Sequence, residues 1–220
     1  VKYQRMIMEA EAPDSLGEDR FRYNLAESSV RDRSLGELGI EFGDMVLPYG
    51  DHFGAPELRA LIAGISDEAL SAEHVLVTAG AAGALFIIAT SLLEPGDQIV
   101  VGFPNYATNY ETPGAIGARV EHHDQNFDRG FRIDVDAIER QVTPETRLLS
   151  LTCPHNPSGA VFSSDDLARL IDLVERMGCW LVLDQTYREM TYGEPLPVAA
   201  ALSDNVISVN SMSKTWGLPG

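Results

Sequence analysis

The final stretch of the chain, residues 206–220, places a lysine in a setting that suits covalent chemistry. Residues 206–209 form a short apolar run that predicts a buried strand, and Ser211 and Ser213 follow it just before Lys214. The chain then becomes rich in glycine, so the amine stands where a strand ends. A desolvated ε-amine loses its proton readily and attacks carbonyl groups, forming a Schiff base with an aldehyde. The alternative is an ordinary solvated lysine, since most lysines are exposed.

A carboxylate at the end of another apolar run is the second candidate for chemistry. Residues 180–183 are continuously apolar, which is typical of a central parallel strand, and Asp184 ends the run. Burial of a carboxylate is costly unless a cation meets it. A bound cation meets that cost, and at 4 Å the attraction between two unit charges is roughly 4 kcal/mol at an effective dielectric of 20. The alternative is that Asp184 only caps a following helix.

Two turns beside predicted strands present further polar groups. Residues 153–159 hold two prolines and a glycine around Asn156, which indicates a stiff turn in which the Asn156–Pro157 bond tolerates the cis form. Residues 79–83 form a glycine-rich turn before an apolar helix. Free backbone N–H groups and the helix dipole there suit a phosphate, although any tight turn before a helix uses glycine.

These segments resemble those of the class I/II aminotransferases, also called fold-type I enzymes. The lysine segment Ser211 to Gly220 is similar to the family's pyridoxal-phosphate motif. The upstream segments that match, in the family's order, are Tyr49-Gly50, Gly80-Ala81-Ala82, Phe103-Pro104-Asn105-Tyr106, Asn156-Pro157-Ser158-Gly159 and Asp184-Gln185-Thr186-Tyr187. The resemblance covers residues 40–220 well and the preceding residues poorly.

The resemblance implies pyridoxal 5′-phosphate (PLP) as cofactor and catalytic roles for Lys214, Asp184 and Tyr187. Lys214 is expected to hold the cofactor as a Schiff base and then to move a proton as general base and acid. Asp184 is expected to keep the ring nitrogen protonated, which makes the ring an electron sink. The residues expected to contact the cofactor are Gly80, Ala81, Ala82, Tyr106, Asn156, Asp184, Tyr187, Ser211, Ser213, Lys214 and Tyr49.

The resemblance also implies what the ring contacts do. Tyr106 is expected to stack on the pyridine ring, and such stacking adds about 0.5 to 1.5 kcal/mol beyond area burial. Asn156 and Tyr187 are expected to bind the 3′ oxygen. The alternatives are that Tyr106 is a core residue and that Asn156 serves only its turn.

The cofactor phosphate is expected to be held by Ser211, Ser213 and the backbone of residues 80–82. Many relatives carry a hydroxyl residue where this chain has Ala79 or Ala81. Without that side-chain donor, the backbone N–H groups must supply more of the hydrogen bonds to the phosphate. Tyr49 is expected to reach the phosphate of the neighbouring subunit in a homodimer. Its alternative role is to pack in a turn against the next helix.

One segment departs from the family pattern. Members usually have a glycine- and proline-bearing loop that closes over the substrate, whereas this chain has Glu27-Ser28-Ser29-Val30. With the following Gly36-Glu37-Leu38, this serine-rich version is similar to capreomycidine-synthase-like members, which act on arginine. Residues 34–38 also fit a plain helix start, with Ser34 as N-cap and Glu37 at the third helical position.

Composition and charge exclude several classes of protein. The chain has 220 residues, of which 45% are hydrophobic and 22% charged, as in ordinary globular proteins. Its net charge of -17 disfavours nucleic acid and anionic lipid as partners. The apolar block 84–93 is about half of a membrane span. The adjacent His122-His123 lacks the usual spacing of metal ligands, so no metal is expected. Cys153 and Cys179 are expected to be buried free thiols in a reducing cytoplasm.

Apolar runs that alternate with helical periodicity predict an α/β fold. The predicted strands are 74–78, 98–102, 120–123, 148–152, 180–183 and 206–209, and the predicted helices are 56–62, 80–93, 134–141 and 163–178. Helix 163–178 has Ser164 as predicted N-cap and apolar residues at helical spacing from Leu167. The resemblance extends this fold to three α/β/α layers with a mostly parallel seven-stranded-type sheet.

The resemblance implies a large PLP-binding domain over residues 46–220, incomplete at its C-terminal end. Residues 1–45 are expected to belong to a small domain and the substrate-closing loop. Since the sequence stops inside a motif that family members carry further, we expect it to be part of a longer chain.

The expected activity is transfer of an amino group between an α-amino acid and a 2-oxo acid. A lyase, cyclase or oxidase acting on an amino acid, with arginine as one candidate, remains an alternative, because these reactions begin with the same carbanion. A third possibility is a PLP-binding regulatory domain without turnover. Such regulators carry a basic helix-turn-helix, and no segment before Tyr49 resembles one.

Overall fold

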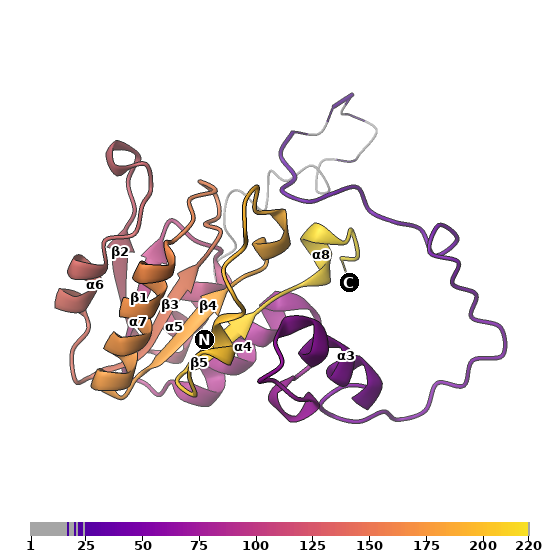
Figure 1. Cartoon of the computed structure of the whole chain (residues 1–220), viewed down its shortest axis with the longest axis horizontal. Coiled ribbons are helices and arrows are strands. Elements are labelled where there is room, and N and C mark those ends of the chain that lie inside the picture. Colours follow the sequence, from indigo (N-terminus) through magenta and orange to yellow (C-terminus); the bar gives the residue numbers. More distant parts are fainter. Residues whose placement is uncertain (1–16, 18–19, 21, 24, 220) are drawn as a thin grey trace.

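The computed structural model describes residues 17, 20, 22, 23 and 25–219 (Figure 1). Its centre is a parallel sheet with the strand order β2-β1-β3-β4-β5. The strands are β1 Gln98–Phe103, β2 Arg119–Asp124, β3 Thr146–Thr152, β4 Trp180–Asp184 and β5 Val206–Val209. Because all strands run in one direction, their carboxyl ends meet at one edge of the sheet.

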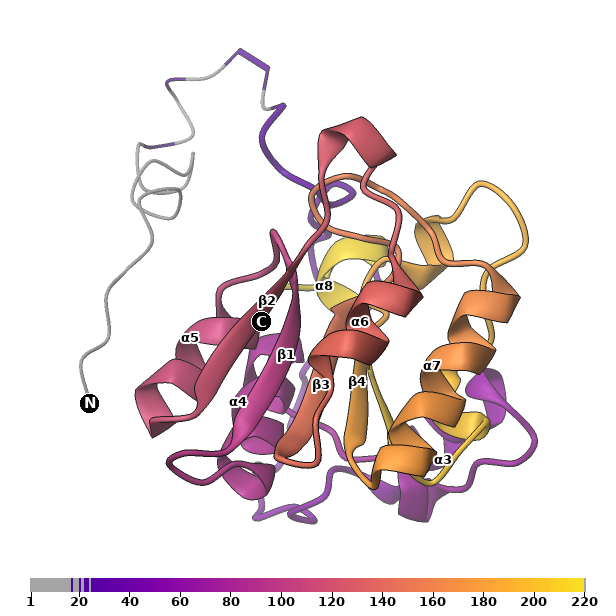
Figure 2. The same cartoon turned by 90° about the vertical axis from the view of Figure 1, so that its left-hand side faces the viewer.

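Helices cover both faces of this sheet (Figure 2). The helices are α3 Pro56–Ser66, α4 Gly80–Leu92, α5 Thr108–Ile116, α6 Val135–Gln141, α7 Ser164–Met177 and α8 Met212–Thr215. α6 and α7 share one apolar cluster with the sheet, and α4 and α5 share a second cluster on the other face. The inner strands β1, β3 and β4 are buried on both sides, which explains their apolar runs, whereas the edge strand β2 is mostly polar. The predicted α/β/α fold is confirmed.

The start of α7 corrects one prediction. Ser163, and not Ser164, is the N-cap: its backbone is extended, and its Oγ accepts a hydrogen bond from the Asp166 N–H at 3.0 Å. Asp166 in turn accepts from the Ser163 N–H, completing a capping box. Two adjacent serines are equivalent by residue type, and the backbone conformation decides which one caps.

The predicted strand at residues 74–78 is wrong. Residues Ala72–His74 form a short 3₁₀ helix, and the Val77 N–H donates to the Phe53 carbonyl at 2.9 Å. This segment therefore pairs with a loop and not with the sheet. The sheet has five strands within the described residues, where the resemblance implied a seven-stranded type.

A segment before the sheet lies along the turn that follows β5. We call residues 27–33 the strap. The Val30 N–H donates to the Lys214 carbonyl at 3.0 Å, and the Arg33 N–H donates to the Gly217 carbonyl at 3.1 Å. The strap thus brings residues near the beginning of the chain beside the candidate lysine.

Both cysteines are free and buried, as predicted. Burial raises the pKa of the Cys153 thiol to about 11, so this thiol stays protonated and unreactive near neutral pH. None of the described helices has the length and apolar character that crossing a bilayer requires.

Candidate active site

The candidate residues from β4 and β5 lie at the carboxyl edge of the sheet. Asp184, at the end of β4, pairs in register with Thr152 of β3 and with Val209 of β5. The chain then continues into the turns that carry the other candidates. The Cys153 N–H donates to the Asp184 carbonyl, and the Gln185 N–H donates to the Val209 carbonyl. This edge is where open α/β sheets bind ligands.

Asp184 is a buried carboxylate, with only 5% of its surface exposed. Its Oδ1 accepts a hydrogen bond from the Thr186 N–H at 3.0 Å. Burial raises the pKa of Asp184, and the hydrogen bond from the Thr186 backbone N–H offsets part of that rise. No cation among the described residues forms an ion pair with this carboxylate. The site therefore suits a bound group that brings a positive charge, such as a protonated ring nitrogen.

Two buried hydroxyl groups also fit a polar bound group. Within the described part of the chain, Thr186 Oγ1 and Thr215 Oγ1 are buried without a hydrogen-bond partner. Thr186 follows Asp184 by two residues and Thr215 follows Lys214 directly. Buried polar groups are normally paired, so these two hydroxyl groups indicate a place where a bound group completes the hydrogen bonds of the protein.

Tyr187 and Asn156 come together beside Asp184. The Asn156 side-chain amide donates to the Tyr187 hydroxyl at 3.4 Å, and this hydroxyl lies 2.7 Å from Ser28 Oγ. Burial raises the pKa of Tyr187, the Ser28 hydroxyl lowers it, and the charges of Asp184 and Glu27 raise it further. The Asn156–Pro157 bond is cis, within the predicted turn. The structure therefore brings the phenol and the amide within hydrogen-bonding distance of each other, as two groups that bind one oxygen must be.

Asn105 holds the neighbouring turn, and its role was not predicted. Its Oδ1 accepts hydrogen bonds from Thr152 Oγ1 at 2.9 Å, from the Tyr106 N–H at 2.7 Å and from the Asn109 amide at 3.1 Å. This one side chain joins the end of β3 to the start of α5 and so positions Tyr106. The ring of Tyr106 is 44% exposed and free to stack on a ligand.

His155 ties the two turns together, and it was also missed. Its Nε2 lies 2.8 Å from the Pro104 carbonyl, to which it donates, so its Nδ1 accepts from Ser158 Oγ at 2.6 Å. Burial lowers the pKa of His155, which favours this neutral form. Asn105 lies inside one quoted motif and His155 directly precedes another, so their positions at these motifs were the signal that pointed to them.

Lys214 lies in α8, one turn after β5. Ser211 is the N-cap of α8, and its Oγ accepts from the Ser213 N–H and contacts the Ser213 hydroxyl. The Lys214 amine lies 3.9 Å from Glu27 Oε2 in the strap. Glu27 and Ser28 were predicted only as part of a variant loop, yet they contact the lysine and the tyrosine of the candidate site.

The remaining candidates divide into two groups. Gly80 opens α4 with φ +69°, a conformation that favours glycine, and Ala81 packs against the apolar cluster that contains Val209. The start of α4 therefore packs on one face of the sheet, beside the carboxyl end of β5. Tyr49 is fully exposed and does not join the other candidates within this chain.

Comparison with known proteins identifies the family. The family model "Aminotransferase class I and II" matches residues 28–220. The arginine–pyruvate transaminase of Pseudomonas aeruginosa is 35% identical over 179 residues, which are 78% of this chain and 46% of that protein. An aspartate aminotransferase of Streptomyces avermitilis is 31% identical over 76% of this chain and 43% of its own length. The chain spans about half the length of these two relatives.

Solved structures share the fold. A PLP-dependent aminotransferase from Streptococcus suis superposes with a TM-score of 0.89 and 28% identity, covering all of this chain and 61% of that one. An aspartate aminotransferase from Thermus thermophilus with maleate reaches a TM-score of 0.71 at 27% identity over 76% of this chain and 46% of its own. The ordered motifs, the sheet-edge site and the family match agree: the chain belongs to the class I and II aminotransferase family.

Proposed function

We propose that this chain carries the PLP site of an aminotransferase that moves an amino group between an α-amino acid and a 2-oxo acid. The observation that carries the proposal is the buried Asp184 carboxylate, which has no cationic partner among the described residues and ends the strand next to the one preceding Lys214. PLP supplies an aldehyde that condenses with amines and a ring that accepts electrons from the substrate Cα.

The side chains of this site have distinct roles in the proposal. Lys214 would hold the cofactor covalently, and its amine, when free, would take a proton from the substrate Cα as general base and give a proton back as general acid. Asp184 would hold the ring nitrogen protonated. Tyr187 and Asn156 would bind the 3′ oxygen, Tyr106 would stack on the ring, and the phosphate would be held by Ser211, Ser213 and residues 80–82.

The proposal extends to assembly and location. Residues 46–220 make up the large domain, and residues 1–45 contribute to a small domain and to the cover of the site. The active form is a cytoplasmic homodimer in which Tyr49 reaches the partner's cofactor phosphate. Two observations support it: Tyr49 is fully exposed in one subunit, and the chain keeps two buried free thiols.

An arginine-like amino donor is the second candidate, and the strap favours it. Glu27 holds a carboxylate 3.9 Å from the Lys214 amine, which places a negative charge where an amino donor arrives. A cationic side chain is attracted by such a charge. The name of the Pseudomonas relative, an arginine–pyruvate transaminase, agrees with this candidate. A lyase, cyclase or oxidase on the same amino acid remains the alternative reaction.

The covalent site has a direct test, because the chain contains only two lysines, Lys2 and Lys214. PLP followed by borohydride is expected to label the peptide that contains Lys214. The variant Lys214→Ala is expected to lose the label, and the matched control Lys2→Ala to keep it. Label that persists in Lys214→Ala would contradict the assignment.

The reaction itself is tested with the loaded protein and a panel of amino acids that includes aspartate and arginine, with pyruvate as acceptor. Mass spectrometry is expected to find the 2-oxo acid of at least one donor together with alanine formed from pyruvate. Products of elimination, cyclisation or oxygen incorporation would support the alternative enzymes. Covalent cofactor without conversion of any amino acid would favour the regulatory domain.

A further inference from the structure

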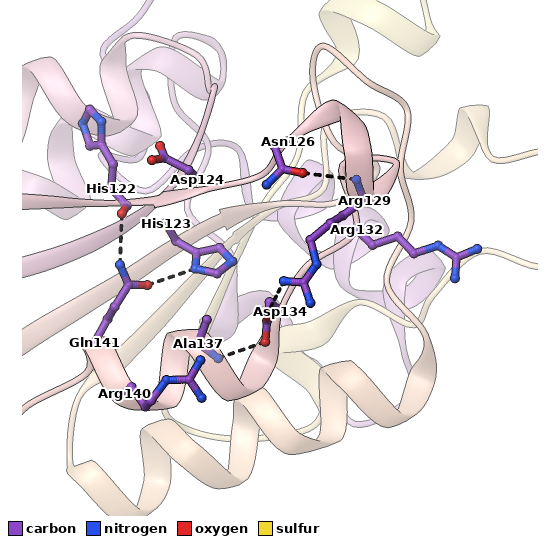
Figure 3. A pocket seen from close by; sticks show the side chains of 10 residues that line it. All are labelled: His122, His123, Asp124, Asn126, Arg129, Arg132, Asp134, Ala137, Arg140 and Gln141. Atoms are coloured by element: carbon purple, nitrogen blue, oxygen red, sulfur yellow. Dashed lines mark hydrogen bonds and ion pairs between the residues drawn. The ribbon is translucent and has the colours of Figure 1, made fainter.

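A cavity of about 360 Å³ lies away from the candidate active site, at the carboxyl end of β2 (Figure 3). Its walls come from β2, from the loop that follows it and from α6. None of the residues assigned to the cofactor lines it. Its lining is dominated by polar side chains, among them His123, Asn126, Arg129, Asp134, Arg140 and Gln141.

The imidazole of His123 is buried, with 4% of the residue exposed, and it projects into the space between β2 and α6. Gln141 sets its tautomer. The Gln141 Nε2 donates to the His122 carbonyl at 3.0 Å, so its Oε1 accepts the hydrogen of His123 Nδ1 at 2.9 Å. The other ring nitrogen, Nε2, is open to the cavity, and no described residue bonds to it. In the neutral ring this nitrogen is an acceptor, which a ligand can reach with a hydrogen-bond donor.

The charges around the cavity favour an anion. Arg129, Arg132 and Arg140 bring three guanidinium groups, against the carboxylates of Asp124 and Asp134. Asp134 is already engaged: it pairs with Arg129 and accepts from the Ala137 N–H at 3.0 Å, and the Arg129 guanidinium lowers its pKa. Arg132 and Arg140 form no ion pair with any described residue.

The second carboxylate, that of Asp124, leaves the arginines in excess at the cavity. His122 and Asp124 alternate with His123 along β2, and all three residues line the cavity (Figure 3). In a chain with a net charge of -17, a cavity with an excess of guanidinium groups is a local exception. No group of three or more His, Cys, Asp or Glu in the described part of the chain is arranged to hold a metal, so His123 has no partners for a metal site.

We propose that this cavity binds a small oxyanion of the phosphate class. A hydroxyl of the phosphate donates to His123 Nε2, and its charged oxygens accept from the guanidinium groups of Arg129 and Arg140. Hydrogen phosphate carries both a donor and negative charge, whereas sulfate near neutral pH carries only the charge. The site is independent of the cofactor site and does not require the proposed transamination.

The test uses a signal that belongs to this cavity alone. The protein with ¹⁵N-labelled histidine is titrated with inorganic phosphate, and the His123 ring signal is assigned as the one missing from His123→Asn. A saturable shift of this signal is expected, with sulfate binding about tenfold or more weakly because one hydrogen bond to a charged ligand is lost. Phosphate bound near Lys214 does not mimic this shift.

Two arginine variants separate a site from general charge. Arg140→Gln is expected to weaken phosphate binding about tenfold or more. Arg119→Gln makes the same charge change at the other end of β2, where Arg119 already pairs with Glu145, and is expected to leave the affinity unchanged. Absence of a saturable shift, equal binding of sulfate, or equal losses in the two variants would overturn the proposal.

Discussion

At the scale of single residues, Asp184 sets the energetics of the site. A carboxylate without a cation in a buried place costs free energy when it is ionised, and this cost is why burial raises its pKa. A raised folded-state pKa means that the folded protein holds its proton to higher pH than the unfolded chain, whose aspartates ionise near about 3.9. The free energy of unfolding therefore falls as pH rises above that value, until the folded pKa is passed.

Replacing this carboxylate without changing its shape removes the cost. In the absence of cofactor at pH 7, the free energy of unfolding of Asp184→Asn is expected to exceed that of the wild type by about 1 kcal/mol or more. The difference is expected to vanish near pH 3, where both unfolded and folded Asp184 are protonated. Urea unfolding at the two pH values measures it.

The control for this change is Asp204→Asn, which alters an exposed aspartate and is expected to have little effect at either pH. Addition of PLP is expected to reverse the order of stabilities, because only the carboxylate pairs with a protonated ring nitrogen. A wild type that is as stable as Asp184→Asn at pH 7 without cofactor would contradict the account of Asp184.

At the scale of elements, the contact between the strap and α8 depends on a glycine. Gly217 has φ +66°, and a Cβ there would lie 2.3 Å from the Arg31 carbonyl oxygen. The close approach of the two backbones explains why a residue without a side chain stands here. This contact also holds Glu27 and Ser28 against Lys214 and Tyr187.

Gly217→Ala is expected to detach the strap. The left-handed backbone alone costs an alanine about 1 kcal/mol or more, and the clash with Arg31 adds to that cost. Hydrogen exchange is expected to accelerate at the amides of Val30 and Arg33, which donate to Lys214 and Gly217. Chemical denaturation and exchange mass spectrometry measure both effects.

The matched control is Gly178→Ala at the end of α7. Gly178 has the same φ of +66°, but no atom lies within 4 Å of the position its Cβ would take. The free energy of unfolding of this variant is expected to fall only by the cost of the left-handed conformation, and hydrogen exchange in the strap is expected to stay unchanged. Equal effects of the two variants would show that the strap contact contributes nothing.

At the scale of the whole molecule, an extended segment carries apolar side chains into solvent. Between the strap and α3, the chain has no helix or strand over residues 40–53, and Leu47 and Tyr49 are 87% and 104% exposed. The exposed apolar side chains of this segment are Ile40, Phe42, Met45, Val46, Leu47, Tyr49 and Phe53. Apolar surface of this extent in a folded protein marks an interface, which agrees with the proposed homodimer.

Leu47→Asp is expected to weaken the dimer at least about tenfold, because it places a charge in the apolar interface. Sedimentation equilibrium is expected to find a dimer for the wild type and a shift toward monomer for the variant. Phe127→Asp, at another exposed aromatic residue, serves as control and is expected to remain dimeric. A monomeric wild type at every concentration would contradict the proposed dimer.

The sequence alone was sufficient for the elements with strong local signals. Five of the predicted strands are present, because continuous apolar runs such as residues 180–183 are stable only between two helical layers. Residues 74–78 have the same β-rich composition but no strand beside them, so composition alone misled there. Likewise, Ser163 and Ser164 differ only in backbone conformation, which no residue type encodes.

The sequence by itself determined the strands of the sheet, the family motifs and the order of the candidate residues along the chain, since each depends on neighbours a few positions apart. Only the tertiary structure decided which of them meet. Ser28 contacts Tyr187, which lies 159 positions later in the chain, and Asn105 accepts a hydrogen bond from Thr152, 47 positions later. Such contacts depend on how the loops close between elements, and hydrophobic periodicity reports which face of an element is buried but not which distant side chain arrives beside it.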